Sequence, residues 1–401
     1  MASPEATERA RAEASSRRLA VFEAVAGRGW TAILLAALVA LPLAWIIRRS
    51  LAGYGAVPLP VDLMVFLNAA DGILAGQNPF PAPAELTGDA NYVYPPLLAI
   101  VAIPLAVLPV APAVLIWTLL SAGAIAAALW LLGVRDWRLY GLCVLLAGTR
   151  DAIAAGTVGP LLVLGSAIAW RYRDRRPALA GAGAGLAIAL KLFVWPLLLW
   201  LVVTRRARTA LLAVVIGGGA ALASWAVIGF DGLTDYPDLL RRLSDLEADQ
   251  SYSMYAVGRA VGLASPLAVG FSLAVGATFL AVMVWTARNV AIPAAERDRL
   301  ALTAAIAASL ALTPILWIHY LVLLIVPLAL ARPRFAPLWL VALVPAAVRI
   351  VGWSPAGWPG GDPPSLAVVL GTTVLVLALM LRSVHREAAP PQGGRSDSSL
   401  C

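Results

Sequence analysis

Three ionisable residues that border or interrupt apolar segments define the chemistry that this chain can offer. They are Asp62, Lys191 and His319. A carboxylate can take the proton of a hydroxyl nucleophile, and a lysine can hold a phosphate leaving group and neutralise the charge that it gains. A phosphate carried by a lipid enters from the bilayer, so the base that binds it must lie at membrane depth, where we expect Lys191.

Each of the three also has a plain structural interpretation. Asp62 alone fits equally well a solvated loop acid before an amphipathic helix, and His319 fits a packing histidine. Lys191 can extend from a helix end to the membrane interface. We favour a functional role for Lys191, because it is the single lysine among 30 basic residues and interrupts an apolar run.

Composition places the chain among polytopic membrane proteins. It has 401 residues, of which 61% are hydrophobic and 13% charged, whereas soluble domains have roughly 45–50% and 25%. The net charge of +8 arises from arginine clusters between apolar runs, which is typical of cytoplasmic loops and not of nucleic-acid binding. The two cysteines, Cys143 and Cys401, indicate neither a disulfide framework nor a metal site.

Charge asymmetry predicts the orientation in the plasma membrane. The polar, Arg-rich N-terminus precedes a first span at 31–47, and no basic residue then occurs between Arg49 and Arg135. Because basic loops stay inside, both termini are expected in the cytoplasm and the loop 50–93 outside. The predicted parts are a disordered cytoplasmic lead at 1–29, one transmembrane domain at 30–386 with outer loops at 50–93 and 230–261, and a disordered cytoplasmic tail at 387–401.

The first outer loop has its own helical pattern. Apolar residues recur at helical spacing over 61–75, and Gly76 follows them. We therefore expect a helix lying in the membrane interface and ending at Gly76, with Asp62 in its first turn, where the helix dipole favours a carboxylate.

Twelve further apolar runs follow the first span, and several are too short to cross a bilayer straight. With both termini inside, the number of spans must be even, so the region 139–170 is expected to be one broken crossing and not two. We predict an all-α bundle of about twelve spans. The runs are 95–109, 112–133, 139–149, 157–170, 178–190, 192–203, 210–229, 262–287, 299–313, 318–330, 336–351 and 366–381.

This topology brings the polar candidates to one face. The run 178–203 must be a hairpin of two short helices with its tip near Lys191, and 299–330 places His319 near another outer tip. The loop 230–261 adds three further candidates, although Arg259 alone also fits a base at a helix end. Asp62, Lys191, Gln250, Ser251, Arg259 and His319 are thus all expected near the outer surface. The G-x-G patterns at 181–185 and 217–219 are interpreted as helix-packing residues.

One carboxylate, one or two bases and one histidine at an outer membrane face suit glycosyl transfer from a polyprenyl-phosphate sugar, which requires no nucleotide site. The order of several short motifs then resembles glycosyltransferase family 87. These motifs are Asp62-x-x-Val65-Phe66, Gly76-Gln77-Asn78-Pro79-Phe80, Tyr92-x-Tyr94-Pro95-Pro96, Arg176-x-x-x-Ala180-Gly181 leading to Lys191, Asp249-Gln250-Ser251 with Arg259, and Thr313-Pro314-Ile315-x-Trp317-x-His319.

That resemblance covers about 50–330 and departs from the family at Asp249, Thr313 and the Gly156-Thr157-Val158-Gly159 loop. It implies the GT-C fold and polyprenyl-phosphate-mannose-dependent α-mannosyl transfer to a glycolipid or glycan hydroxyl. By analogy Asp62 is the general base and His319 a second catalytic residue. Lys191 and Arg259 are expected to bind the donor phosphate, and Tyr94, Gln250, Ser251 and Trp317 the substrates.

Several alternatives stay open at this point. We expect inversion in a single displacement, because one base and no second nucleophilic carboxylate is evident. No cofactor is expected, but Asp62 and His319 also suit a metal ion, so metal dependence is open. The sugar can be another, such as arabinose. A transporter would place charges near the bilayer midplane in two repeated halves, and a structural scaffold would give Lys191 no reason to face one side.

Overall fold

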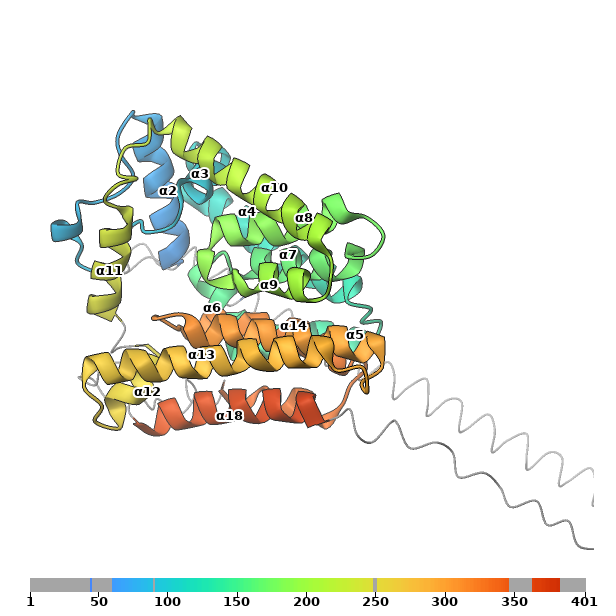
Figure 1. Ribbon diagram of the computed structural model, residues 1–401. Helices are drawn as coiled ribbons and strands as arrows, with labels where there is room; N and C mark the ends of the chain where they lie inside the picture. Colours follow the sequence, from blue (N-terminus) through green and yellow to red (C-terminus); the bar gives the residue numbers. More distant parts are fainter. Residues whose placement is uncertain (1–43, 45–59, 89–90, 248–250, 346–362, 383–401) are drawn as a thin grey trace, which may run out of the picture.

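The structure, a computed structural model, describes residue 44 and residues 60–88, 91–247, 251–345 and 363–382. Within these ranges the chain forms helices and no strands, which confirms the predicted all-α class. The helices pack around a continuous apolar core (Figure 1). The predicted first span, apart from residue 44, and both predicted disordered ends lie outside the described residues.

The helix predicted in the first outer loop is present as α2 (Val61–Leu74). Asp62 lies in its first turn, and Gly76 follows it with a φ of 71°, a value that glycine adopts without strain. Protein covers its apolar side: Phe66 is completely buried, and α2 packs along α3 (Pro96–Ala106). The predicted position of α2 in the membrane interface stays a prediction.

A central group of helices packs through small residues. A Cβ atom at Gly185 would lie 2.3 Å from the Ala213 carbonyl oxygen, and one at Gly165 would lie 2.6 Å from that of Gly183. The predicted packing role is therefore confirmed for Gly181, Gly183, Gly185 and Gly217, whereas Gly218 and Gly219 have no such contact. The group comprises α4 (Val110–Leu131), α7 (Gly159–Tyr172), α8 (Pro177–Leu190) and α10 (Ala207–Val227).

A second group of helices lies against the first (Figure 1). Its centre is α14 (Ala294–Leu312), in which every residue from Asp298 to Ala311 is buried. Such a helix is enclosed by protein on all sides. Its neighbours are α13 (Ser265–Arg288), α15 (Ile325–Ala331), which is followed by α16 (Pro337–Val341), and α18 (Pro363–Arg382).

Three helices of the described ranges are long and apolar enough to cross a membrane. They are α4, α10 and α13. The other apolar helices have 10–17 residues, because prolines, glycines and polar motifs interrupt the apolar runs. A helical membrane protein is supported, whereas about twelve full spans are not. The region 139–170 is broken into α5 (Trp137–Leu145), α6 (Ala147–Ala155) and α7, and whether it crosses the membrane once stays a prediction.

The predicted hairpin around Lys191 is present. Helix α8 ends at Leu190, the short 3-10 helix η2 (Leu192–Val194) follows, and α9 (Pro196–Val203) continues the chain. Asp174 before α8 and Arg206 after α9 form an ion pair of 2.8 Å, so the chain returns to the place where the segment began. Lys191 is thus at the tip, about 20 Å from that pair by the length of α8.

The two predicted outer loops contact each other. The second contains α11 (Tyr236–Glu247) and α12 (Met254–Ala260). The Phe80 ring of the first loop stacks on Trp225 with centroids 5.3 Å apart and meets Tyr236 edge-on at 5.4 Å. The Tyr236 hydroxyl donates to the Val93 carbonyl at 3.0 Å. This aromatic cluster fixes the loop that leads from α2 through the 3-10 helix η1 (Pro83–Glu85) to α3.

Candidate active site

An acid, a phenol and an amine from three separate segments form a hydrogen-bonded chain. The Tyr94 hydroxyl donates to Asp62 Oδ2 at 3.3 Å, and the Lys191 amine donates to the Tyr94 oxygen at 3.3 Å. Asp62 belongs to α2, Tyr94 precedes α3, and Lys191 follows α8. The structure therefore joins the carboxylate and the lysine that the sequence singled out, and it does so through Tyr94.

Tyr94 stands outside the helix for a local reason. The residue before a proline is disfavoured in the helical conformation, and Pro95 is itself extended, so α3 begins only at Pro96. The Tyr94 ring meets Phe66 of α2 edge-on with centroids 5.0 Å apart. Burial and the Asp62 carboxylate raise the pKa of Tyr94 well above its ordinary value. The hydroxyl therefore keeps its proton and donates it in the hydrogen bond to Asp62.

The Lys191 ammonium lies against aromatic rings. It is 3.9 Å from the ring centroid of Tyr320, 4.7 Å from that of Tyr94 and 5.9 Å from that of Phe193. Neither a ring face nor a neutral hydroxyl cancels its charge, so the amine keeps its capacity for an anion.

The position of Lys191 also affects its protonation. It occupies the non-helical break between α8 and η2, outside the three candidate spans. Burial lowers the pKa of Lys191 to about 7, and the nearby Asp62 carboxylate opposes this decrease. A bound phosphate would stabilise the ammonium further, because an adjacent negative charge favours the charged form.

The segment that carries the predicted histidine enters the site from the end of α14. Thr313 ends that helix in an extended conformation, and its hydroxyl donates to the Ile315 carbonyl at 2.7 Å. The 3-10 helix η4 (Ile318–Leu324) then presents His319 and Tyr320, whose ring centroids are 4.8 Å apart. The Tyr320 ring thus contacts both the His319 imidazole and the Lys191 amine.

The loop of Gly156-Thr157-Val158-Gly159 links the segments of both predicted catalytic residues. A Cβ atom at Gly156 would lie 2.9 Å from the Cβ of Pro60 and 2.7 Å from that of Leu63, the residues on either side of Val61 and Asp62. A Cβ atom at Gly159 would lie 2.9 Å from Val322 of η4 and 3.6 Å from the His319 carbonyl oxygen. Only glycine permits such close approach, so this loop sets the spacing between α2 and η4.

The loop 230–261 contributes less directly. Ser251 is completely buried, and its hydroxyl donates to Ser253 Oγ, which caps α12. The Tyr252 amide donates to the Leu316 carbonyl at 2.8 Å, so this loop packs on the segment that leads to η4. The predicted substrate contact of Ser251 stays a prediction.

Three further predicted residues have varied placements. Gln250 lies outside the described residues. Arg259 is exposed near the end of α12, and its guanidinium donates to the Leu263 carbonyl at 2.9 Å, so its predicted contact with the donor phosphate stays a prediction. Trp317 is half-buried immediately before η4, and its carbonyl accepts from the Tyr320 amide at 2.9 Å.

Sequence reasoning did not identify Tyr320 and Phe193 as site residues. Their rings stack with centroids 4.9 Å apart, and both contact the Lys191 amine. The signal was available, because each aromatic residue lies within two positions of a residue that was singled out, Phe193 after Lys191 and Tyr320 after His319.

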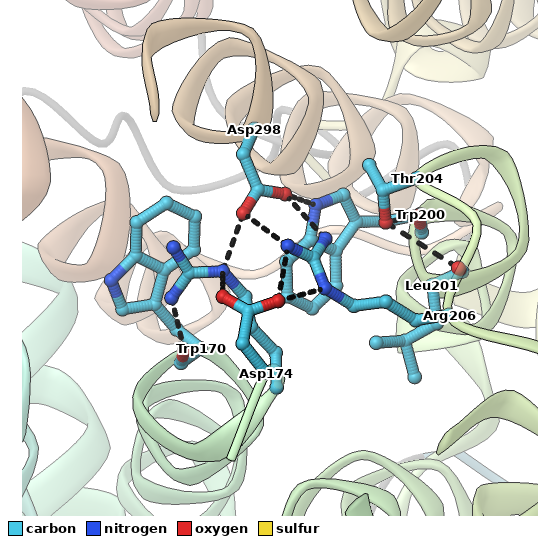
Figure 2. Close-up of polar contacts among 8 residues, drawn as sticks. Trp170, Asp174, Trp200, Leu201, Thr204, Arg206 and Asp298 are labelled. Carbon is cyan, nitrogen blue, oxygen red and sulfur yellow. Dashed lines mark hydrogen bonds and ion pairs between the residues drawn. The ribbon is translucent and has the colours of Figure 1, made fainter. Parts of the chain in front are cut away.

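A second ion cluster was also missed, at the open end of the α8–α9 hairpin (Figure 2). Asp298 of α14 accepts two bonds of 2.9 Å from Arg206, one of 3.1 Å from the Trp200 indole and one from Arg173 Nε. The Arg173 guanidinium lies 3.7 Å from the ring centroid of Trp170. These residues come from arginine clusters that the sequence assigned to separate turns, and the structure brings them together.

The fold and the site together define a class of protein. The described part of this strongly apolar chain is all-helical and contains three candidate membrane spans. Its helices bring a carboxylate, a tyrosine hydroxyl and a lysine into one chain of hydrogen bonds. The class is thus that of helical membrane proteins, with an acid, a phenol and an amine gathered at one place.

The sequence profile of glycosyltransferase family 87 matches residues 92–317, which is more than half of the 401-residue chain, and the chain belongs to that family. The match includes Tyr94 and Lys191, while Asp62, His319 and Tyr320 lie beyond its limits. This confirms the family inferred from the motifs.

A curated relative agrees with the family assignment. The chain is 27% identical over 340 residues to a polyprenol-phosphate-mannose-dependent alpha-(1-2)-phosphatidylinositol mannoside mannosyltransferase of Mycolicibacterium smegmatis, with 75% of this chain and 77% of the relative covered. No solved structure matches the chain significantly.

Proposed function

We propose that the protein transfers a mannosyl unit from a polyprenyl phosphate to a hydroxyl of a glycolipid or glycan at the outer face of the plasma membrane. The family and the named activity of the mycobacterial relative support a glycosyltransferase that uses such a donor. The observation that carries the proposal is the Asp62–Tyr94–Lys191 chain, which joins a base for the acceptor to a cation for the donor phosphate.

In the proposed reaction, Asp62 removes the proton of the acceptor hydroxyl. The acceptor oxygen forms a bond to the anomeric carbon while the bond between that carbon and the phosphate oxygen breaks, so the anomeric centre inverts. Polyprenyl phosphate leaves with the electron pair, and Lys191 stabilises the charge that develops on it. Tyr94 bonds to both the carboxylate and the amine and so fixes their relative position. His319 lines the same site from η4.

The proposed setting follows from the same residues. The donor enters laterally from the bilayer toward Lys191, with its lipid passing over the exposed side chains of Leu192 and Trp195 at the hairpin tip. The acceptor approaches Asp62 from water. We propose a multi-pass protein of the GT-C type with cytoplasmic termini, in which Arg259, Gln250 and Trp317 complete the substrate site.

The proposal is tested with the purified full-length chain, radiolabelled polyprenyl-phosphate mannose and a phosphatidylinositol mannoside acceptor. We expect labelled glycolipid of increased size, detected by thin-layer chromatography, and no transfer from a nucleotide-activated mannose. Failure of the wild-type protein to use any polyprenyl-phosphate sugar would overturn the proposal. Parallel reactions with EDTA show whether the reaction depends on a divalent metal.

Two other functions are distinguished in the same experiment. Transfer of arabinose in place of mannose would keep the chemistry and change only the sugar. A lipid or solute transporter would move labelled lipid across proteoliposomes without forming a new glycosidic bond. The base beside the cation favours transfer, because a transporter has no need to deprotonate a hydroxyl.

A further inference from the structure

The Lys191 amine is held mainly by rings. Its shortest ring contact is with Tyr320, at 3.9 Å from the centroid, and Tyr320 belongs to η4, more than a hundred residues away in the sequence. Phe193 stacks on Tyr320 with an interplanar angle of 21°, and His319 meets the same ring edge-on. The Tyr320 ring is therefore fixed by its neighbours in an orientation that presents a face to the amine.

The choice of partner matters for a phosphate-binding cation. A carboxylate in direct contact would neutralise the ammonium and compete with an incoming phosphate. A ring face attracts the ammonium through its quadrupole and carries no net charge. The amine is thus restrained in position, while its charge stays available to a ligand.

We propose that Tyr320 is a positioning residue for donor binding, whose ring face holds the Lys191 ammonium at the place where the lipid phosphate binds. This inference rests on the proposed function, because it assigns Lys191 to a polyprenyl-phosphate donor. It adds a residue that neither the motifs nor the limits of the family match include. The Tyr320 hydroxyl has no part in the proposed role. A variant that keeps the ring and lacks the hydroxyl therefore distinguishes this role from hydrogen bonding.

The test compares Tyr320→Leu, which removes the ring, with Tyr320→Phe and Tyr320→Trp, which keep a ring face. In donor titrations with the full-length chain, Tyr320→Leu is expected to raise the donor KM about 3- to 30-fold, with kcat within about twofold of wild type. Tyr320→Phe and Tyr320→Trp are expected to stay within about threefold of wild type in donor KM. The split between KM and kcat excludes a merely structural role, which would reduce the active fraction and not the affinity.

A matched control uses another cation–ring pair. The Arg135 guanidinium lies 5.2 Å from the ring centroid of Trp130, so Trp130→Leu removes a contact of the same kind elsewhere. It should leave the donor KM unchanged. An unchanged KM in Tyr320→Leu, or equal loss in Tyr320→Phe, would overturn the proposal.

Binding of polyprenyl phosphate itself, followed by isothermal titration without any sugar, separates the two ideas. If the wild type binds this lipid but transfers no sugar, the proposed function fails, and weaker binding by Tyr320→Leu still supports the role of the ring. If the wild type transfers mannose and Tyr320→Leu binds the lipid equally well, only the role of the ring is wrong.

Discussion

The two ends of the α8–α9 hairpin treat buried charge in opposite ways. At the open end, Asp298 accepts hydrogen bonds from two arginines and an indole, and the arginines compensate its negative charge (Figure 2). At the tip, Lys191 contacts a tyrosine hydroxyl and ring faces, and the Asp62 carboxylate is joined to it through the Tyr94 hydroxyl. The two ends lie about 20 Å apart along α8.

The difference separates structure from chemistry. A charge that is removed from water must be paired if it only holds the fold, because an uncompensated buried ion is costly. A charge that binds a substrate must instead stay partly unpaired, at some cost in folding free energy, until the ligand binds. The Asp298 cluster joins α14 to the hairpin, whereas the Lys191 cluster is the proposed binding place of the donor phosphate. Variants at the two ends should therefore have different consequences.

The largest effect is expected for Asp62, the proposed general base, which is joined to Lys191 at the tip through Tyr94. Asp62→Asn keeps the shape of the side chain but removes its ability to take a proton, so kcat should fall about 10²- to 10⁴-fold with donor binding nearly unchanged. Initial rates at saturating donor measure this. Asp71→Asn, an exposed change on the same helix, is the control. Near-native turnover of Asp62→Asn would remove Asp62 from the mechanism.

At the open end, Asp298→Ala should affect stability and not turnover. The change leaves Arg173 and Arg206 without their shared partner, and breaking such a buried pair typically costs about 3–5 kcal/mol. We expect a lower melting temperature in detergent and an unchanged kcat per folded molecule. Asp238→Ala removes an exposed ion pair with Arg241 and should cost less than about 1 kcal/mol. A selective loss of kcat in folded Asp298→Ala would contradict the division between the two ends.

Lys191→Ala should weaken donor binding more than acceptor binding. Loss of a charge-assisted hydrogen bond to a phosphate costs about 1.5–3 kcal/mol, which corresponds to about 10- to 150-fold in affinity. Titration with polyprenyl phosphate measures it directly. Lys191→Arg keeps the charge and should recover part of the affinity. Equal donor affinity in wild type and Lys191→Ala would show that the phosphate binds elsewhere.

The smallest expected effect is on pH dependence. Because burial lowers the pKa of Lys191 to about 7, the free amine loses its proton as the pH rises through neutrality. Only the protonated amine attracts phosphate strongly, so donor affinity should be constant well below pH 7 and fall by up to about tenfold per pH unit above it. The dependence should vanish in Lys191→Ala. A donor affinity that rises between pH 7 and pH 9 would contradict the assignment of Lys191 as the phosphate-binding cation.

Part of the fold and of the site could be predicted from the chain alone. The high apolar content and the spacing of arginine clusters indicate a helical membrane protein, because these are properties of local segments. The helix of α2, the break at Lys191 and the hairpin around it were predicted for the same reason. Motif order sufficed for the family, which the profile match confirms. The described residues do not support the count of about twelve spans, since run length does not show which short helices are enclosed by protein.

Only the tertiary structure decided which segments remote in the sequence contact each other. Tyr94 joins residues 32 and 97 positions away, and Arg173 reaches Asp298 across 125 positions. No local pattern specifies these pairings, because they depend on how whole helices pack and on glycines that let backbones approach. The sequence by itself determined which residues can do chemistry. Helix packing decided that Tyr320 faces Lys191, that protein covers α2, and that Asp298 shares its charge with two arginines.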